Sequence, residues 1–178
     1  MSLNPVTVNV QMKLTIQETL TLDPAASGTP QTQVVTHSGM DYAPAALTSS
    51  TTPPAVGCAL CTITMSSGSA TISLESLTTQ LGPVVTGAGY RVQQIKLQAP
   101  STNAAVITLV PDSGSNPYSA SGGSFIFAAS GQISLTPGDE VQWTNRSGTA
   151  APVVSSTVKN LSLSGTGADQ LNIEIVFG

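Results

Sequence analysis

The stretch VNVQMKLTIQETLTL, residues 8–22, alternates apolar and polar side chains along almost its whole length. Its even positions are apolar except for Glu18, and its odd positions carry amides, hydroxyls and Lys13. Successive side chains of a β-strand point to opposite faces, so this alternation predicts one long strand or a hairpin pair, with one face against a second layer. The other face is predicted to meet solvent or a partner through short polar groups. The stretch therefore predicts a β-sandwich or a β-barrel.

Short runs with strand character recur through the rest of the chain and are separated by turn residues. They lie at residues 33–36, 58–65, 70–74, 90–98, 105–110, 124–128, 132–135, 140–145, 153–157, 159–164 and 171–177. The spacing of Leu74, Leu77 and Leu81 ahead of Gly82 and Pro83 predicts a single short helix. This pattern predicts an all-β fold, specifically a jelly-roll-like antiparallel β-sandwich that occupies residues 1–178 as a single domain.

Three local patterns make this prediction more specific. The turn at residues 66–69 is predicted to join the runs 58–65 and 70–74 into a hairpin. The apolar residues of the run 90–98 break strict alternation by one position, which predicts a β-bulge at Gln93 and Gln94. The run 105–110 is apolar on both faces, so we expect it in the middle of a sheet.

Residues 24–56 are rich in Pro, Ser, Thr, Gly and Ala and are predicted to form an extended loop or arm, with a short strand at 33–36 inside it. The segment is long for a connection between strands, and an extended chain can lie along a neighbouring molecule or add to a sheet edge. The candidate interaction residues in this arm are Leu47, Thr51, Thr52 and Val56.

Charged residues make up only 8% of the 178 residues, against about a quarter in ordinary domains, and the formal net charge is -4. A surface of neutral polar groups repels neighbouring copies weakly, so close packing into a multimer is tolerated. The five basic residues are scattered, which argues against nucleic-acid binding. We expect no membrane partner, no signal peptide and synthesis in the cytoplasm, because neither a bilayer-spanning stretch nor a leader pattern is visible.

Cys58 and Cys61 form the sharpest motif match, two cysteines separated by two residues. A metal site would need further ligands, but His37 is the one histidine and there is no third cysteine. The pair precedes a strand pattern rather than the helix start of a redox motif, so we expect one thiol in the core and one on the opposite face of a strand. We predict no metal and no cofactor.

Other chemistry-bearing residues are also interpreted as structural. His37, Ser38 and Asp41 are neighbours in sequence, which does not create the geometry of a hydrolase. Turn residues surround Asp112 and Asp139, and turns explain these carboxylates better than calcium binding or glycosidase chemistry does. We therefore predict no catalytic residues and a protein that is not an enzyme.

The hypothesis of a glycan-binding protein depends on exposed aromatic rings, because ring faces can stack on sugars. Tyr42, Tyr90 and Tyr118 are candidate surface rings, and a cluster of them around one groove would favour a soluble glycan- or ligand-binding β-sandwich module. Four further aromatic residues fall on alternating strand positions and are predicted to pack in the core: Phe125, Phe127, Trp143 and Phe177.

A series of strand-and-turn patterns occupies residues 90–178. It comprises IKLQAP (95–100), NPY (116–118), SLTPGD (134–139), NLSLSG (160–165) and IEIVFG (173–178). In these patterns the chain resembles small virion proteins of tailed bacteriophages, namely jelly-roll capsid decoration or cement proteins and other minor structural subunits. The resemblance implies no catalytic residues, and it implies oligomers, often trimers, on the faces or junctions of a capsid.

The favoured hypothesis is a non-enzymatic virion structural protein, specifically a capsid decoration or cement protein that packs as an oligomer on or between shell subunits. Its expected partners are copies of itself and a major capsid or other virion protein, with no nucleic acid and no membrane. Its expected location is the virion, after synthesis in the host cytoplasm. The glycan- or ligand-binding module stays open as the alternative, and an enzyme is a distant third.

Overall fold

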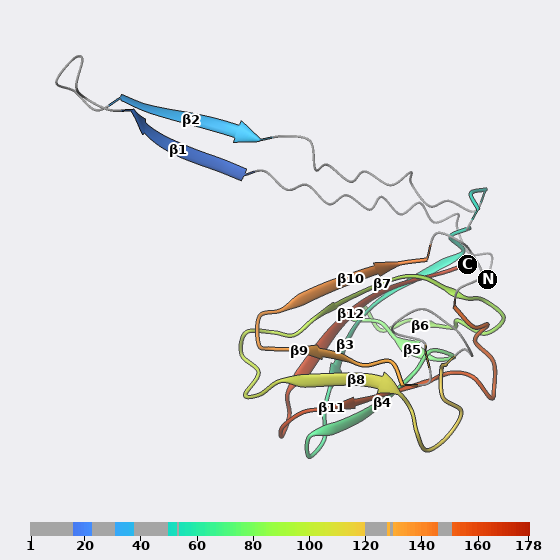
Figure 1. Ribbon diagram of the computed structural model, residues 1–178. Helices are drawn as coiled ribbons and strands as arrows, with labels where there is room; N and C mark the ends of the chain where they lie inside the picture. Colours follow the sequence, from blue (N-terminus) through green and yellow to red (C-terminus); the bar gives the residue numbers. More distant parts are fainter. Residues whose placement is uncertain are drawn as a thin grey trace. The chain divides into compact units, whose positions relative to one another are not determined.

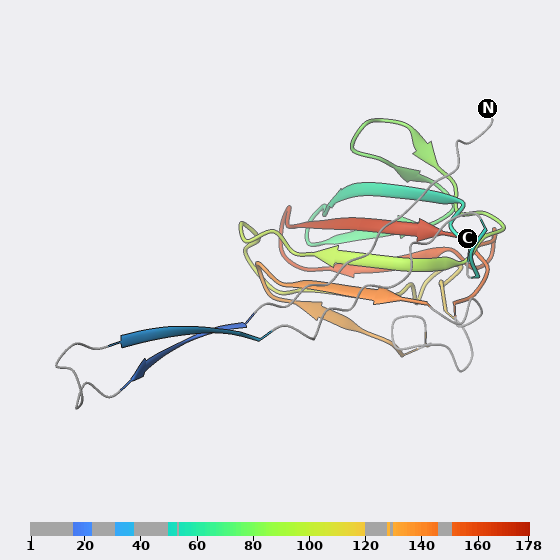
Figure 2. The same cartoon turned by 90° about the horizontal axis from the view of Figure 1, so that it is seen from above.

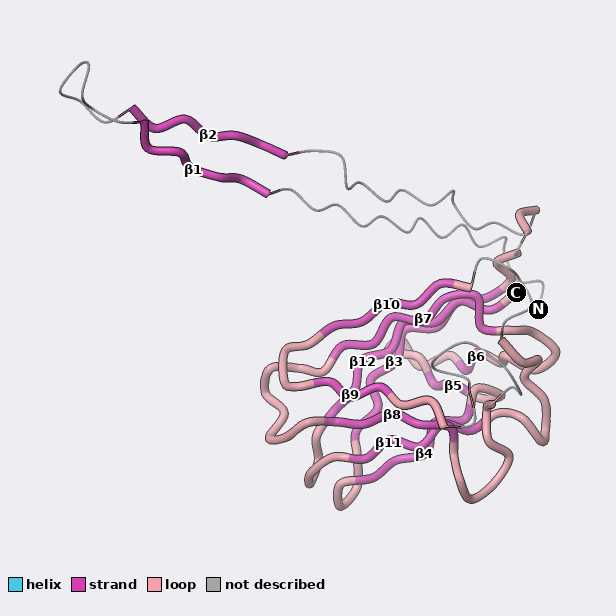
Figure 3. Tube along the Cα trace, viewed as in Figure 1, coloured by secondary structure: helices cyan, strands magenta, loops and turns pink. Residues whose placement is uncertain are grey.

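The computed structural model of the chain describes residues 16–22, 31–37, 50–52, 54–119, 128, 130–145 and 151–178. By their contacts the residues divide into two compact units, one of Val8–Ala46 and one of Met1–Thr7 with Leu47–Gly178. All regular structure in the described part is β-structure, and Figure 3 shows strands and loops there and no helix. The predicted all-β class is confirmed, and no described helix could span a membrane.

Eight strands of the larger unit form two four-stranded antiparallel sheets (Figures 1 and 2). One sheet has the order β10-β7-β12-β3, and the other has the order β4-β11-β8-β9. The eight strands are β3 (Gly57–Thr64), β4 (Ser69–Ser73), β7 (Val92–Gln98), β8 (Ile107–Pro111), β9 (Ile133–Leu135), β10 (Glu140–Thr144), β11 (Asn160–Ser164) and β12 (Gln170–Phe177).

The strand pairing is nested. β8 pairs with β9, β7 with β10, β4 with β11 and β3 with β12. This is the pairing of one long antiparallel hairpin whose turn lies between β8 and β9. Two further pairings, β12 with β7 and β11 with β8, close this hairpin into a roll. An eight-stranded double sheet of this topology is a jelly roll, so the predicted β-sandwich is confirmed.

The core lies between the inward faces of the two sheets. Leu171, Ile173 and Ile175 of β12 are buried while Glu174 between them is exposed, which is the two-residue alternation of a half-buried strand. Leu161 and Leu163 of β11, in the opposite sheet, are buried with the same alternation. Each such side chain contributes about 1.5–3 kcal/mol by leaving water, so these strands supply most of the driving force for packing the sheets together.

The predicted helix at Leu74–Leu81 is wrong. The segment instead forms two short strands, β5 (Leu77–Thr78) and β6 (Val84–Val85), which pair with each other beside β3 (Figure 2). Leu74 and Leu77 are buried and Leu81 is exposed, so the three leucines do not share one face. Gly82 adopts a positive φ of 97° and its amide donates to Thr79, which favours a tight turn here over a helix end.

The predicted hairpin around residues 66–69 is half right. Ser66 and Ser69 pair across a turn in which Ser67 and Gly68 have positive φ. The strands on either side nevertheless belong to different sheets, because β3 pairs with β12 and β4 pairs with β11. The turn is a corner of the jelly roll, where the chain leaves one sheet and enters the other.

The remaining strand predictions have mixed outcomes. The bulge is confirmed: Val176 pairs with Gln94 and Phe177 with Val92, which leaves Gln93 as the extra residue on β7. β8 lies inside its sheet, as the doubly apolar run 105–110 predicts. Residues 153–157 form isolated bridges instead of a strand. The run 124–128 lies outside the described residues apart from residue 128.

The smaller unit contains one described hairpin. β1 (Ile16–Leu22) pairs antiparallel with β2 (Gln31–His37), so that Ile16 lies opposite His37 and Leu22 opposite Gln31. The strand predicted from the alternation is thus present over its second half, and residues 8–15 lie outside the described part. The short strand expected inside the segment 24–56 is also present, with wider bounds. Whether the chain acts as a single domain stays a prediction.

Candidate interaction surface

The outer face of the sheet β10-β7-β12-β3 brings polar residues from four strands into rows. In one row Gln142, Lys96, Glu174 and Leu60 are successive partners across the sheet. In the next row the partners are Glu140, Gln98, Asn172 and Thr62. These positions alternate with the buried ones, so their side chains point away from the core.

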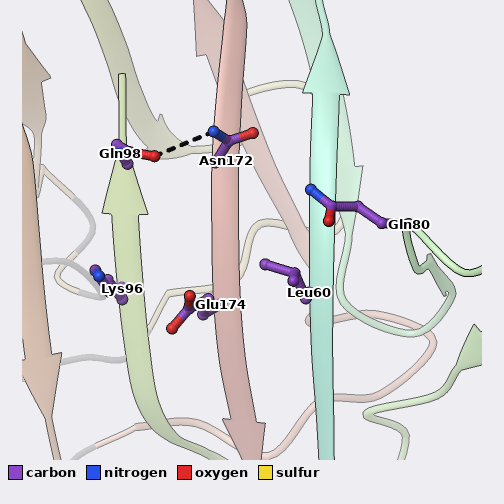
Figure 4. Close-up of a pocket in the computed structure, with 6 residues that line it drawn as sticks. All are labelled: Leu60, Gln80, Lys96, Gln98, Asn172 and Glu174. Carbon is purple, nitrogen blue, oxygen red and sulfur yellow. Dashed lines mark hydrogen bonds between the residues drawn. The ribbon is translucent and has the colours of Figure 1, made fainter. Parts of the chain in front are cut away.

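Amide and hydroxyl groups on this face form a continuous chain of hydrogen bonds, which we call the amide ladder (Gln80, Thr62, Asn172 and Gln98). Gln80 Nε2 donates to Thr62 Oγ1 at 2.8 Å, and Thr62 Oγ1 donates to Asn172 Oδ1 at 2.8 Å. Asn172 Nδ2 donates to Gln98 Oε1 at 3.2 Å (Figure 4). All three hydrogen bonds are exposed to solvent. The ladder is therefore a neutral polar surface whose groups are hydrogen-bonded to one another.

The charges beside the amide ladder are few and largely compensated. Lys96 Nζ lies 3.1 Å from Glu140 Oε1, and both side chains are partly exposed. An ion pair of this exposure contributes about 0–1 kcal/mol to folding, so its main effect is to lower the net charge of the face. Figure 4 shows Glu174 between Lys96 and Leu60, one row along from Asn172.

Three exposed apolar residues belong to β3 and to the β5–β6 segment beside it, and we call this group the apolar strip (Leu60, Leu81 and Val84). Their side chains are 43%, 93% and 61% exposed. The backbone amide of Gln80 donates to the carbonyl oxygen of Leu60 at 2.9 Å, which fastens the β5–β6 excursion to β3. The excursion thereby occupies part of an edge that would otherwise offer free backbone groups to another chain.

Three of the hollows in the described part of the chain lie on or near this face. The hollow bordered by three ladder residues (Gln80, Gln98 and Asn172) and by Leu60, Lys96 and Glu174 has a volume of about 100 Å³. A groove of about 340 Å³ between β3, β4 and β5 is lined both by Thr and Ser residues and by Ile63, Ile72 and Leu77. A third hollow of about 190 Å³, which we call the apolar pocket, is lined by Val56, Cys58, Val84, Val85, Tyr90 and Phe177. Pockets for small molecules usually span about 300–1,000 Å³, so the hollow at the ladder and the apolar pocket are smaller than this range, while the groove lies at its lower end.

The two cysteines lie as the sequence predicts. Cys58 is exposed and Cys61 is buried, and both are free thiols. Burial raises the pKa of the Cys61 thiol, because the charged thiolate loses its hydration there. Within the described residues no three metal-ligating side chains gather. The His37, Ser38 and Asp41 group cannot be placed, since Ser38, Asp41 and the His37 side chain lie outside the described part.

We expect the two thiols to differ sharply in reactivity. In dilute native solution a thiol reagent should modify one cysteine per chain within minutes, and peptide mapping should place the label on Cys58. Cys61 should react only after unfolding in denaturant. Equal labelling of both residues in the folded protein would contradict the placement of Cys61 in the core.

The candidate arm residues are spread over different environments. Leu47 lies outside the described residues. Thr52 is exposed and Thr51 is half-buried. Val56 is half-buried, and its amide donates to the carbonyl oxygen of Phe177 at 2.7 Å, which extends the pairing of β3 with β12. The end of the predicted arm therefore belongs to the body of the sandwich, and the interaction role of these four residues stays a prediction.

The candidate aromatic platform is not assembled from the tyrosines that the structure describes. Tyr118 is buried, which corrects its assignment as a surface ring. Its hydroxyl donates to the carbonyl oxygen of Pro152 at 2.9 Å and accepts from the Val92 amide at 3.2 Å. Tyr90 is half-buried beside the apolar pocket, and Tyr42 lies outside the described part. Among the predicted core rings Phe177 is buried, Trp143 packs partly exposed against the core, and Phe125 and Phe127 lie outside the described part.

The two aspartates assigned to turns do serve turns. Asp112 accepts from the amides of Gly114 at 3.1 Å and Ser115 at 3.3 Å, and from Ser162 Oγ at 2.9 Å. These bonds, that of Gly114 first, lower the pKa of the Asp112 carboxyl. Asp139 accepts from the hydroxyl of Thr136 and from its amide, and these bonds lower its pKa in the same way.

Comparison with models of known protein families finds no match. No curated protein matches the sequence either. Among solved structures, one match is a chain of the cyanophage Pam1 capsid asymmetric unit, with 16% sequence identity and a TM-score of 0.30. The matched region covers 67% of this chain and 80% of that one.

Proposed function

We propose that this chain is a non-enzymatic structural subunit of a virus particle, which packs against copies of itself and against a larger protein shell. In its most specific form, the proposal is a capsid decoration or cement protein of a tailed bacteriophage. The virion assignment comes from the strand-and-turn patterns of residues 90–178. The assembly role is supported independently by the outer face of the sheet β10-β7-β12-β3.

The observation that carries the assembly role is the amide ladder with the apolar strip beside it. Protein interfaces typically combine an apolar centre with a polar, hydrogen-bonding rim, and this face has both parts side by side. The ladder groups are hydrogen-bonded to one another in the free chain, which reduces the side-chain entropy that would be lost on binding.

The low charge of the chain supports the same role. With 8% charged residues and a formal net charge of -4, neighbouring copies experience little mutual repulsion at short range. The jelly roll adds a rigid frame that holds four strands of the face in fixed register. The fold alone assigns no function, since the same architecture occurs in capsid proteins, lectins and enzymes.

The test combines light scattering with binding to shells. The purified chain should form a defined oligomer as its concentration rises, and it should bind saturably to particles that lack it. If the chain stays monomeric and does not bind shells, yet gives a saturable signal on a glycan array, the assembly role is wrong and the glycan-binding alternative replaces it.

A double variant tests whether this face carries the binding. Gln98→Glu with Asn172→Asp places two carboxylates on positions that are direct partners across the sheet, close to Glu174 and Glu140. We expect at least about a tenfold loss of shell binding or self-association, because like charges would be buried together. Thr71→Asp with Ser134→Glu is the matched control, since it adds the same charge on exposed positions of the other sheet. Equal losses in both variants would show that net charge, and not this face, decides assembly.

A further inference from the structure

Leu81 is presented to solvent by a tightly held turn. The Gly82 amide donates to the Thr79 carbonyl at 2.9 Å, and the Thr79 amide and hydroxyl both donate to the Pro83 carbonyl at 3.0 Å. These bonds close the β5–β6 turn and keep the 93% exposed Leu81 at its tip. A large apolar side chain in such a position gains little for folding. Together with the exposed Leu60 and Val84 it is a candidate contact for another surface.

The apolar pocket lies on the same part of the molecule. Val84, three residues after Leu81, is both a member of the apolar strip and a wall of the pocket. The pocket volume of about 190 Å³ exceeds the roughly 150 Å³ that suffices for a benzene-sized molecule in a protein cavity. A leucine side chain is of about the same size as benzene. The pocket can therefore receive one.

We propose that Leu81 of one copy inserts into the apolar pocket of a second copy of this chain. The inference rests on the self-association put forward above and names the contact that produces it. Leu81 lies in the turn between β5 and β6, and Val84 and Val85 of β6 form one wall of the pocket. In a contact with two-fold symmetry, each copy would insert its Leu81 and receive that of its partner. No charged side chain lines the pocket or belongs to the turn from Thr79 to Pro83, so the insertion of Leu81 itself would bury no charge.

A stable contact needs more buried area than the Leu81 side chain provides. A specific interface buries about 800 Å² on each partner, far more than one leucine supplies. The amide ladder adjoins the apolar strip through Gln80, whose neighbour is Leu81 and whose side chain opens the ladder. Leu81 and the pocket would then form the apolar centre of the interface, and the ladder would supply part of its polar rim.

The first experiment removes the projecting side chain. Leu81→Ser should raise the dissociation constant for self-association by about tenfold or more, because the variant loses the burial of a whole leucine side chain at the contact. The melting temperature should stay unchanged, since Leu81 at 93% exposure contributes little packing to its own chain. Val106→Ser is the matched control at an exposed apolar residue outside the strip, and it should leave association as it is.

The second experiment uses Cys58 as a reporter in the pocket wall. In a Leu81→Cys variant, the introduced thiol of one copy should approach Cys58 of the next. Diamide should then oxidise the two thiols to a disulfide, taking up two electrons and two protons as it is reduced to its hydrazine. A covalent dimer on a non-reducing gel is the expected product. The pair Leu81→Cys with Cys58→Ser should give no dimer, and neither should Val106→Cys.

The outcomes separate this contact from the proposed function. If the parent chain self-associates but Leu81→Ser changes nothing and no cross-link forms, the Leu81 contact is wrong while the assembly role stands. If the parent is monomeric and binds no shell, the assembly role itself fails. If Cys58 is shielded from thiol reagents in the isolated monomer, a segment of the same chain occupies the pocket, which also overturns the proposal.

Discussion

Replacing Tyr118 by Ala should lower the free energy of unfolding by about 3–5 kcal/mol, the range for deleting a buried aromatic ring. The Tyr118 side chain is fully buried, and its loss would leave a cavity between the sheets. Domains of this kind are stable by only about 5–15 kcal/mol, so the variant should be close to unfolding. Urea denaturation followed by circular dichroism measures the change.

The variant Tyr118→Phe distinguishes the contribution of the hydroxyl to the free energy of unfolding from that of the ring. It keeps most of the packing but removes the donor to the Pro152 carbonyl and the acceptor for the Val92 amide. Leaving buried polar groups unpaired costs about 1–3 kcal/mol. Burial raises the pKa of the Tyr118 hydroxyl, so this group stays protonated and remains a donor at all ordinary pH values. Tyr90→Phe, at a half-buried ring, is the control, and an equal loss there would contradict a specific role for the Tyr118 hydroxyl.

Replacing Gly87 by Val should lower the free energy of unfolding by about 3 kcal/mol, through overpacking. A Cβ at this position would lie 2.5 Å from Phe177 Cε1 and 2.7 Å from the Leu74 carbonyl oxygen. Phe177 is fully buried and the Leu74 oxygen is backbone that accepts from the Gly87 amide, so neither can move aside at low cost.

Thermal and urea unfolding of this variant measure the effect. Gly114→Val is the control, because a Cβ there would meet only Asp112 Oδ1, at 3.6 Å. We expect the control to change the free energy of unfolding by less than about 0.5 kcal/mol, as for most surface substitutions. Similar losses at both positions would show that the contact with Phe177 and Leu74 is not the cause.

The alternation of apolar and polar residues in the sequence correctly predicted the features that depend on the two-residue repeat of a strand. The repeat in residues 16–22 identified a strand, and the interval of three between Cys58 and Cys61 placed one thiol inside and the other outside. The break in the repeat at Gln93 located the bulge that lets β7 follow β12. Each of these features is decided by which side chains lie within a few residues, so sequence alone suffices for it.

For the candidate surface, the sequence could predict its polar character but not which residues are neighbours on it. Polar residues at alternate strand positions indicate an exposed face, but nothing in the sequence indicates that Thr62 and Asn172 are hydrogen-bonded neighbours. They are 110 positions apart, and only the pairing of β3 with β12 brings them together. The apolar strip was missed because the leucine spacing at Leu74, Leu77 and Leu81 fits a helix as well as a turn.

By itself the sequence determined that this chain is built from strands, that its surface carries few charges, and that Asp112 and Asp139 lie in turns. Tertiary structure alone decided that β3 and β4 enter different sheets, that Tyr118 is buried, and that Leu81 stands exposed beside an apolar pocket. The physical reason is that alternation records only which face of a strand avoids water. Which strands become neighbours depends on contacts between residues distant in the chain, and those contacts form only when the whole hairpin rolls up and excludes water from one shared core.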